Sequence, residues 1–236
     1  MSLTYAIGDI HGCFAELKRL LDAIEQHANG QPYRMICLGD YPDKGPDTAG
    51  ALDLLMSWST HSSVPLVCIK GNHDDLMGRA ADDEVVHDKW LAMGGGAVLA
   101  QYGVRRAADL PADILAWLRA LPLTHDDTQR YFVHAGVDPA HPLDDQDAQT
   151  CMTMRGVFLS EDHDFGRHIV HGHTPQLGGE PELRPFRSNL DTNVTQTGRL
   201  TAASFDTRRG GPTAILATTA AGGIDIRQLR REAELS

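Results

Sequence analysis

The stretch Gly8-Asp9-Ile10-His11-Gly12 follows a short apolar run, and the same pattern returns at Gly39-Asp40 and Gly71-Asn72. Asp9, Asp40 and Asn72 are separated by 31 and 32 residues, which is the length of one βαβ unit. Between the first two runs, apolar residues at 17, 20, 21 and 24 keep the spacing of one helix face. The pattern predicts three buried parallel strands with helices over them, at residues 5–7, 35–38 and 66–69.

The rest of the chain divides into a helical middle and a β-rich end. Residues 85–91 and 97–102 are expected to be helical on either side of a break at Gly94-Gly95-Gly96, and Pro111 is expected to open another helix. Further strands are expected at residues 131–133, 168–170, 188–190, 200–205 and 213–216. We therefore predict an α/β fold in one domain over residues 1–236, with a core of about 4–226 and a fraying, charged end at 228–236.

The amino-acid composition and net charge argue against some classes of function. With 42% hydrophobic and 22% charged residues the chain is ordinary globular protein, and its net charge of −11 argues against a general nucleic-acid or anionic-membrane binder. Its four cysteines form no C-x-x-C pair, and no apolar stretch approaches the ~18 residues of a membrane span. We expect a cytoplasmic protein with no membrane partner. A local positive site could still hold a phosphorylated substrate.

Carboxylate, imidazole and amide side chains recur at the positions where the expected strands end. Polar groups immediately after parallel strands are where α/β folds place their sites. Five strand ends carry such groups, and the residues are Asp9 and His11, Asp40 and Asp43, Asn72 and His73, His134, and His173. This set exceeds the four ligands of a structural zinc and suits two divalent ions that share a carboxylate. The mixture of oxygen and nitrogen ligands without thiolates fits manganese, iron, cobalt or zinc.

In combination these motifs resemble the calcineurin-like metallophosphoesterases, and most closely the bacterial and phage serine/threonine protein phosphatases of the PPP type. The resemblance extends over residues 4–205, including 90–96 and 189–205. It implies a sandwich of two mixed β-sheets flanked by helices. It also implies a dinuclear enzyme, most often with manganese, in which a hydroxide bridging the ions attacks the phosphorus of a phosphomonoester.

The resemblance assigns roles to individual residues. One ion would be held by Asp9, His11 and Asp40, and the other by Asp40, Asn72, His134 and His173, with Asp40 as the bridge. His73 would be the general acid and Asp43 the carboxylate that orients it. An adjacent carboxylate keeps an imidazole protonated, ready to donate to a leaving alkoxide. Arg155, Lys44 and Asn72 would bind the substrate phosphate.

The substrate-binding positions depart from the family pattern. Pro42-Asp43-Lys44-Gly45 stands where Val-Asp-Arg-Gly is usual, so that lysine replaces an arginine that would grip phosphate. Asp74 stands where glutamate is commoner, and Asn193 replaces a glycine. The leading interpretation is still a phosphomonoesterase of the PPP protein-phosphatase type, acting on a phosphoprotein. The alternatives are hydrolysis of small phosphate compounds, such as symmetrical dinucleoside tetraphosphates, and phosphodiester hydrolysis. A metal-binding module without turnover is the non-enzymatic alternative.

The remaining histidines are expected to be structural. His171 is the one whose direction stays open, because it precedes His173 by two residues and Gly172 favours a turn between them.

Overall fold

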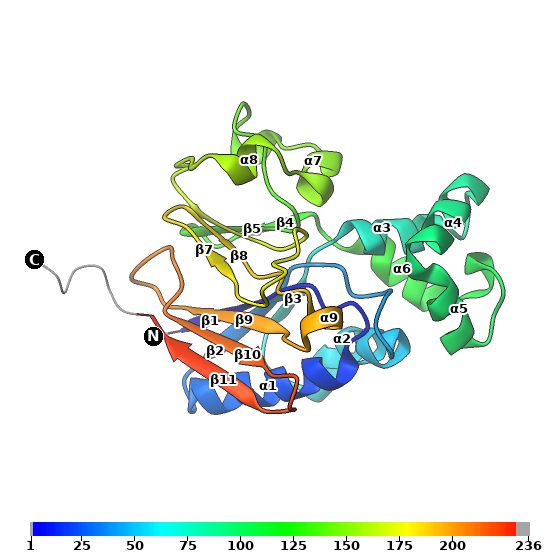
Figure 1. Ribbon diagram of the computed structural model, residues 1–236, viewed down its shortest axis with the longest axis horizontal. Coiled ribbons are helices and arrows are strands. Elements are labelled where there is room, and N and C mark those ends of the chain that lie inside the picture. Colours follow the sequence, from blue (N-terminus) through cyan, green and yellow to red (C-terminus); the bar gives the residue numbers. More distant parts are fainter. Residues whose placement is uncertain (1, 230–236) are drawn as a thin grey trace, which may run out of the picture.

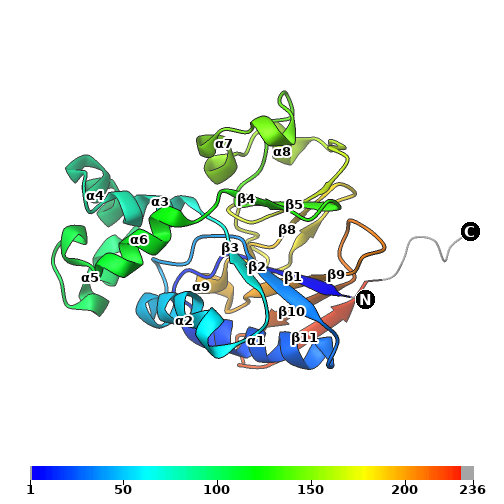
Figure 2. The same ribbon diagram turned by 180° about the vertical axis from the view of Figure 1, so that it is seen from behind.

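The computed structural model describes residues 2–229 (Figures 1 and 2). Its strands are β1 (Leu3–Ile7), β2 (Tyr33–Cys37), β3 (Leu66–Cys68), β4 (Thr124–Asp126), β5 (Arg130–Val133), β6 (His168–His171), β7 (Glu182–Leu183), β8 (Arg187–Asn189), β9 (Thr201–Phe205), β10 (Ala214–Thr218) and β11 (Ile224–Gln228). Its helices are α1 (Phe14–Ala28), α2 (Thr48–His61), α3 (Asn72–Arg79), α4 (Glu84–Trp90), α5 (Gly96–Tyr102), α6 (Ala112–Ala120), α7 (Ala148–Thr153), α8 (Val157–Ser160) and α9 (Val194–Thr197). A π-helical turn at Leu91–Gly95 joins α4 to α5, and short 3-10 turns lie at Ala107–Asp109 and Leu143–Asp145.

The strands form two mixed sheets. The six-stranded sheet has the order β11-β10-β9-β1-β2-β3, with β1, β2 and β3 parallel and the other neighbours antiparallel. The five-stranded sheet has the order β4-β5-β6-β8-β7, in which β5, β6 and β8 are parallel. The predicted architecture of two mixed sheets with flanking helices is confirmed.

Alternation along the strands builds four layers. On β1, Tyr5 and Ile7 pack with α1 and α2, whereas Ala6 between them packs against the second sheet. On β5, Phe132 joins this inter-sheet layer and its neighbours turn toward α7 and α8. Figure 1 shows α1 and α2 below the six-stranded sheet and α7 and α8 above the other sheet. Both faces of the central strands are covered, and the sequences of these strands are therefore continuous apolar runs.

Helices α3 to α6 form a group beside the sheets, on the right in Figure 1 and on the left in Figure 2. We call residues 72–121, which contain these helices, the helical cap. Pro111 precedes α6 as predicted. The expected break in the glycine triplet is a kink, where Gly94 has φ 118° and the helical path continues on both sides of it.

Some elements differ from expectation. β3 is half-buried, because it forms the edge of its sheet. β4, β7 and β11 were not predicted. β11 carries exposed polar residues at most positions, so it lacks the apolar signal of a buried strand. Of the charged end at 228–236, Gln228 closes β11 and residues 230–236 lie outside the described part. Within residues 2–229, no helix has the length and apolar character needed to span a bilayer.

Candidate functional site

The ends of strands from both sheets meet around one cavity of about 280 Å³. Asp40 and Asn72 follow β2 and β3 of the first sheet, and His134 and His173 follow β5 and β6 of the second. Because the carboxyl ends of these parallel strands face the same edge, residues distant in sequence converge there. The cavity is lined by His11, Asp40, Lys44, Asn72, His73, Met93, Arg155, His173, Pro175 and Asp191.

Asp40 is the centre of the cluster. Its Oδ2 lies 3.6 Å from His11 Nε2, and its Oδ1 lies 3.4 Å from His134 Nε2. The same Oδ1 accepts a hydrogen bond from the backbone N–H of His73 at 3.0 Å. The two oxygens thus face different imidazoles, which is the arrangement a bridging carboxylate needs. Ligand atoms lie within 4.8 Å of one another in two groups that share Asp40, namely His11, Asp40 and His73, and Asp40, His134 and His173.

The imidazoles are prepared to ligate a metal. The Nδ1–H of His11 donates to the Pro42 carbonyl at 3.0 Å, and that of His134 donates to the Leu38 carbonyl at 2.8 Å, which leaves both Nε2 lone pairs facing the cluster. Burial lowers the pKa of His11 and of His173 to about 3, so both rings are neutral near pH 7. Metal ligation requires neutral imidazole, and these donors therefore fit divalent ions.

Asp9 and Asn72 complete the predicted ligand set by position. Asn72 Oδ1 lies 3.1 Å from His134 Nε2, at the side of the second group. Asp9 is 2% exposed, accepts the backbone N–H of His173 with both oxygens at 3.2 Å, and is not among the residues that line the cavity. In the first group His73 stands where the prediction had Asp9. The predicted assignment of Asp9 to that ion stays a prediction.

His73 and Asp43 form a buried pair. Asp43 Oδ2 accepts from His73 Nδ1 at 2.6 Å, and the two side chains are 0% and 4% exposed. Burial alone would lower the pKa of His73, but the hydrogen bond from Asp43 and the nearby Asp40 charge raise it above its ordinary value. Burial raises the pKa of Asp43. A raised pKa favours the protonated His73 ring, which is the state a general acid requires.

Two cations line the same cavity. Lys44 and Arg155 are both exposed, so neither needs a buried partner. The Lys44 ammonium donates to His11 Nε2 at 2.8 Å, which places it beside the ligand cluster. The predicted phosphate-binding residues therefore lie where an anion would be held.

Backbone strain concentrates in the same place. Eight described non-glycine residues have positive φ, and five of them are predicted site residues, namely His11, Asp40, Asp43, Lys44 and His173. Such conformations cost free energy and cluster at functional sites. Gly71 permits one close approach, since a Cβ there would lie 2.2 Å from Asp40 Oδ1. The local geometry thus depends on contacts that hold strained turns in place.

A family model described as calcineurin-like phosphoesterase matches residues 3–211. The chain belongs to the calcineurin-like phosphoesterase family. This family consists of metal-dependent phosphoric ester hydrolases, so the predicted family and reaction class are confirmed at that level. The predicted cofactors, divalent metal ions, are confirmed in the same coarse sense.

The relatives of this phosphoesterase carry two kinds of name. A symmetrical bis(5'-nucleosyl)-tetraphosphatase of Methylococcus capsulatus is 34% identical over 211 residues, covering 83% of this chain and 67% of the relative. A Pseudomonas fluorescens protein of the same name is 36% identical over 224 residues, covering 90% and 72%. Serine/threonine-protein phosphatase 1 of Salmonella typhimurium is 28% identical over 210 residues, covering 84% and 90%.

Chain lengths differ within this group. The matched part spans 58% of a tetraphosphatase of Nitrosospira multiformis and 43% of one from Pseudomonas syringae. Among solved structures, the cold-active protein-tyrosine phosphatase of a psychrophile Shewanella species matches with a TM-score of 0.67 at 16% identity, covering 96% of this chain and 80% of that one. This likeness shows the shared fold.

Sequence analysis named Asp74 only as a departure from the family pattern and missed its structural role at the phosphoesterase site. Asp74 is fully buried and accepts the backbone N–H groups of Asp40, Tyr41 and Gly71 at 2.8, 3.0 and 2.7 Å. It thereby fastens the turns that carry Asp40 and Asn72. An acidic residue in the first turn of a helix commonly accepts backbone N–H groups there, and this position is the signal that could have found Asp74.

Asp191 was also missed as a cavity residue. It is 2% exposed, lines the cavity, and follows β8 by two residues. The rule that polar residues follow strands would have identified it. Conversely, His171 is fully buried against Phe158, with ring centroids 5.0 Å apart, and does not line the cavity.

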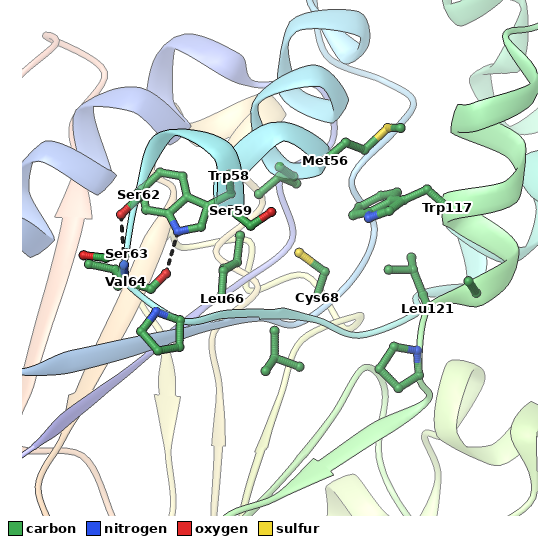
Figure 3. Close-up of a pocket in the computed structure, with 15 residues that line it drawn as sticks. Met56, Trp58, Ser59, Ser62, Ser63, Val64, Leu66, Cys68, Trp117 and Leu121 are labelled. Carbon is green, nitrogen blue, oxygen red and sulfur yellow. Dashed lines mark hydrogen bonds between the residues drawn. The ribbon is translucent and has the colours of Figure 1, made fainter.

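A larger groove of about 600 Å³ lies at the outer edge of β3 (Figure 3). Met56, Trp58, Leu66, Cys68 and Trp117 are among the residues that line it. No carboxylate, imidazole, lysine or arginine lines this groove. This groove therefore lacks the side chains that could hold a metal ion or transfer a proton, whereas the smaller cavity has them.

Proposed function

We propose that this phosphoesterase hydrolyses small phosphate compounds, with symmetrical dinucleoside tetraphosphates as the leading substrate class. The observation that carries this proposal is the Asp40 cluster, which can hold two divalent ions beside a protonated His73. The relatives that are 34% and 36% identical favour the tetraphosphate substrate over a phosphoprotein. The sequence alone had ranked these two substrates the other way round.

The proposed metal ligands are Asp9, His11, Asp40, Asn72, His134 and His173. Bound divalent ions would polarise the phosphoryl oxygens and lower the pKa of a coordinated water. Manganese is our first choice, followed by iron, zinc or cobalt. Lys44 and Arg155 would add positive charge on the cavity wall, which offsets the negative charge of the chain as a whole.

His73 would act on the leaving group. In the proposed step water adds to phosphorus and loses one proton to solvent, the bond from phosphorus to the leaving oxygen breaks, and His73 Nε2–H protonates that oxygen. Solvent then returns a proton to His73. Asp43 holds the ring through Nδ1, so Nε2 is the nitrogen directed at the cluster, 4.0 Å from Asp40 Oδ2. Symmetrical hydrolysis of a dinucleoside tetraphosphate would release two nucleoside diphosphates.

A side-by-side kinetic comparison tests the proposal. The substrates are a symmetrical dinucleoside tetraphosphate, a phosphoserine peptide and p-nitrophenyl phosphate, each assayed with manganese. We expect kcat/KM for the tetraphosphate to exceed that for the peptide at least tenfold, and nucleoside diphosphate to be the only nucleotide product. Release of nucleoside monophosphate, or faster turnover of the peptide, would contradict the proposal.

Protein phosphatase activity is the second candidate. The Salmonella phosphatase is matched over 90% of its length, so its size is close to that of this chain. The pairing of Asp43 with His73 also follows the protein-phosphatase pattern on which the sequence interpretation relied. Faster turnover of the phosphopeptide would select this function. A cytoplasmic location stays a prediction.

A further inference from the structure

Trp90, which lies outside the two sheets, contacts the buried pair formed by His73 and Asp43. Its indole Nε1–H donates to Asp43 Oδ1 at 3.0 Å and to Asp43 Oδ2 at 3.2 Å. Trp90 is the last residue of α4 in the helical cap, 47 residues along the chain from Asp43. Both residues are 0% exposed. A side chain of the cap thus hydrogen-bonds to the carboxylate that holds His73.

The hydrogen bonds from Trp90 have a geometry that can orient the Asp43 carboxylate. A buried carboxylate needs donors, because burial without them disfavours its charged form. His73 engages Oδ2 alone, whereas the indole spans both oxygens, so it fixes the rotation of the carboxylate about its bond to Cβ. With that rotation fixed, Oδ2 stays aimed at His73 Nδ1.

The backbone of the cap is shaped to hold the indole there. A Cβ on Gly95 would lie 2.4 Å from the Trp90 ring, so only glycine admits the ring at this position. Gly94 has φ 118°, and a Cβ there would lie 3.5 Å from Lys44 N and 3.6 Å from Asp43 Cβ. The kinked turn therefore covers the strained Asp43-Lys44 turn, whose φ values are 71° and 66°.

We infer that Trp90 is a positioning residue, which holds the Asp43 carboxylate in the orientation that presents His73 to the leaving group. This inference rests on the proposed role of His73. Without the indole N–H, Asp43 can rotate and the 2.6 Å bond to His73 loosens. The loss should appear where the general acid matters, which is with leaving groups of high pKa.

The matched variants are Trp90→Phe and Trp58→Phe. Both keep an aromatic ring and remove one indole N–H. Trp58 Nε1–H donates to the Val64 carbonyl at 2.9 Å in the β3 groove, away from the metal cavity (Figure 3). We expect Trp90→Phe to lower kcat about tenfold for an alkyl phosphate and less than about twofold for p-nitrophenyl phosphate. Trp58→Phe should leave the ratio of the two rates at the wild-type value. Adding Asp43→Asn to Trp90→Phe should cost little more than Asp43→Asn alone.

An activity-independent measurement accompanies the kinetics. The chain has three tryptophans, so its proton NMR spectrum holds three indole N–H signals. Asp43→Asn should move the signal that disappears in Trp90→Phe and leave the Trp58 signal in place. Equal rate losses on both phosphates, or an unmoved Trp90 signal, would overturn the inference. If the wild-type protein hydrolyses neither of these phosphates nor a symmetrical dinucleoside tetraphosphate, the proposed function fails, while the spectrum still decides whether Trp90 holds Asp43.

Discussion

Replacing Asp43 with asparagine should shift the pH profile of this phosphoesterase in a defined direction. A general acid works while protonated, so activity falls as the pH rises through the pKa of His73. The 2.6 Å bond from Asp43 raises that pKa, and both groups are buried. A hydrogen bond to a charged group contributes about 1.5–3 kcal/mol, and one pKa unit corresponds to about 1.4 kcal/mol. Asp43→Asn should therefore lower, by about 1–2 pH units, the pH at which activity falls on the alkaline side of the profile (the basic limb).

The assay is the pH dependence of kcat/KM for an alkyl phosphate at saturating metal. Asp75→Asn is the control, since Asp75 lies on the same helix as His73 and pairs with Arg79, 57% exposed, at 3.1 Å. This exposed pair should contribute about 0.5 kcal/mol or less, and its loss should leave the limb in place. A basic limb that stays put in Asp43→Asn, or moves equally in both variants, would refute the role of Asp43.

Asp40→Asn should reduce bound metal from about two ions per chain to one or fewer and abolish turnover, and metal analysis that still finds two ions would contradict a bridging role. Lys44→Arg should raise kcat/KM for a monoester relative to a diester about tenfold, because a guanidinium can grip two phosphate oxygens and the dianion offers three. Arg155→Ala should impair both reactions, whereas an unchanged ratio in Lys44→Arg would make Lys44 a bystander. Burial lowers the pKa of His171 to about 3, so the unfolded state takes up a proton below about pH 6.5 while the native state does not. The free energy of unfolding should fall by about 2 kcal/mol between pH 7 and pH 5 through this residue. Urea unfolding of His171→Phe should lack that loss, and an unaltered pH dependence would count against it.

The sequence predicted the strands that carry the site because their residues are mostly apolar, although β3 is only half-buried at the edge of its sheet. Each is a short apolar run followed by a polar residue, and the carboxyl ends of parallel strands meet at one edge. Asp40, His134 and His173 were found by this signal alone, and the structure brings their ligand atoms together. The exposed strand β11 gave no such signal, because its polar residues face outward.

The pattern of apolar and polar residues along the sequence could not predict contacts between distant segments. That Trp90 reaches Asp43 depends on a kink at Gly94 and on the packing of a whole helical cap, neither of which leaves a periodic trace. The hydrogen bonds between Asp9 and the backbone N–H of His173 likewise join residues 164 positions apart. Periodicity identifies the residues at strand ends, but tertiary packing decides which of their atoms face one another.

The candidate ligands come from both sheets, since Asp40 follows β2 and His134 follows β5. An apolar layer that includes Ala6, Ile36, Phe132 and Val170 separates those sheets. The thickness of this layer is consequently a dimension of the active site, since it sets how far His134 stands from Asp40. A cavity opened by Phe132→Ala would be felt as a change in ligand spacing as well as a loss of stability. Interior side chains that do not contact the substrate therefore affect the geometry of the metal ligands. The volume of the buried Phe132 is one of the factors that set the ligand spacing.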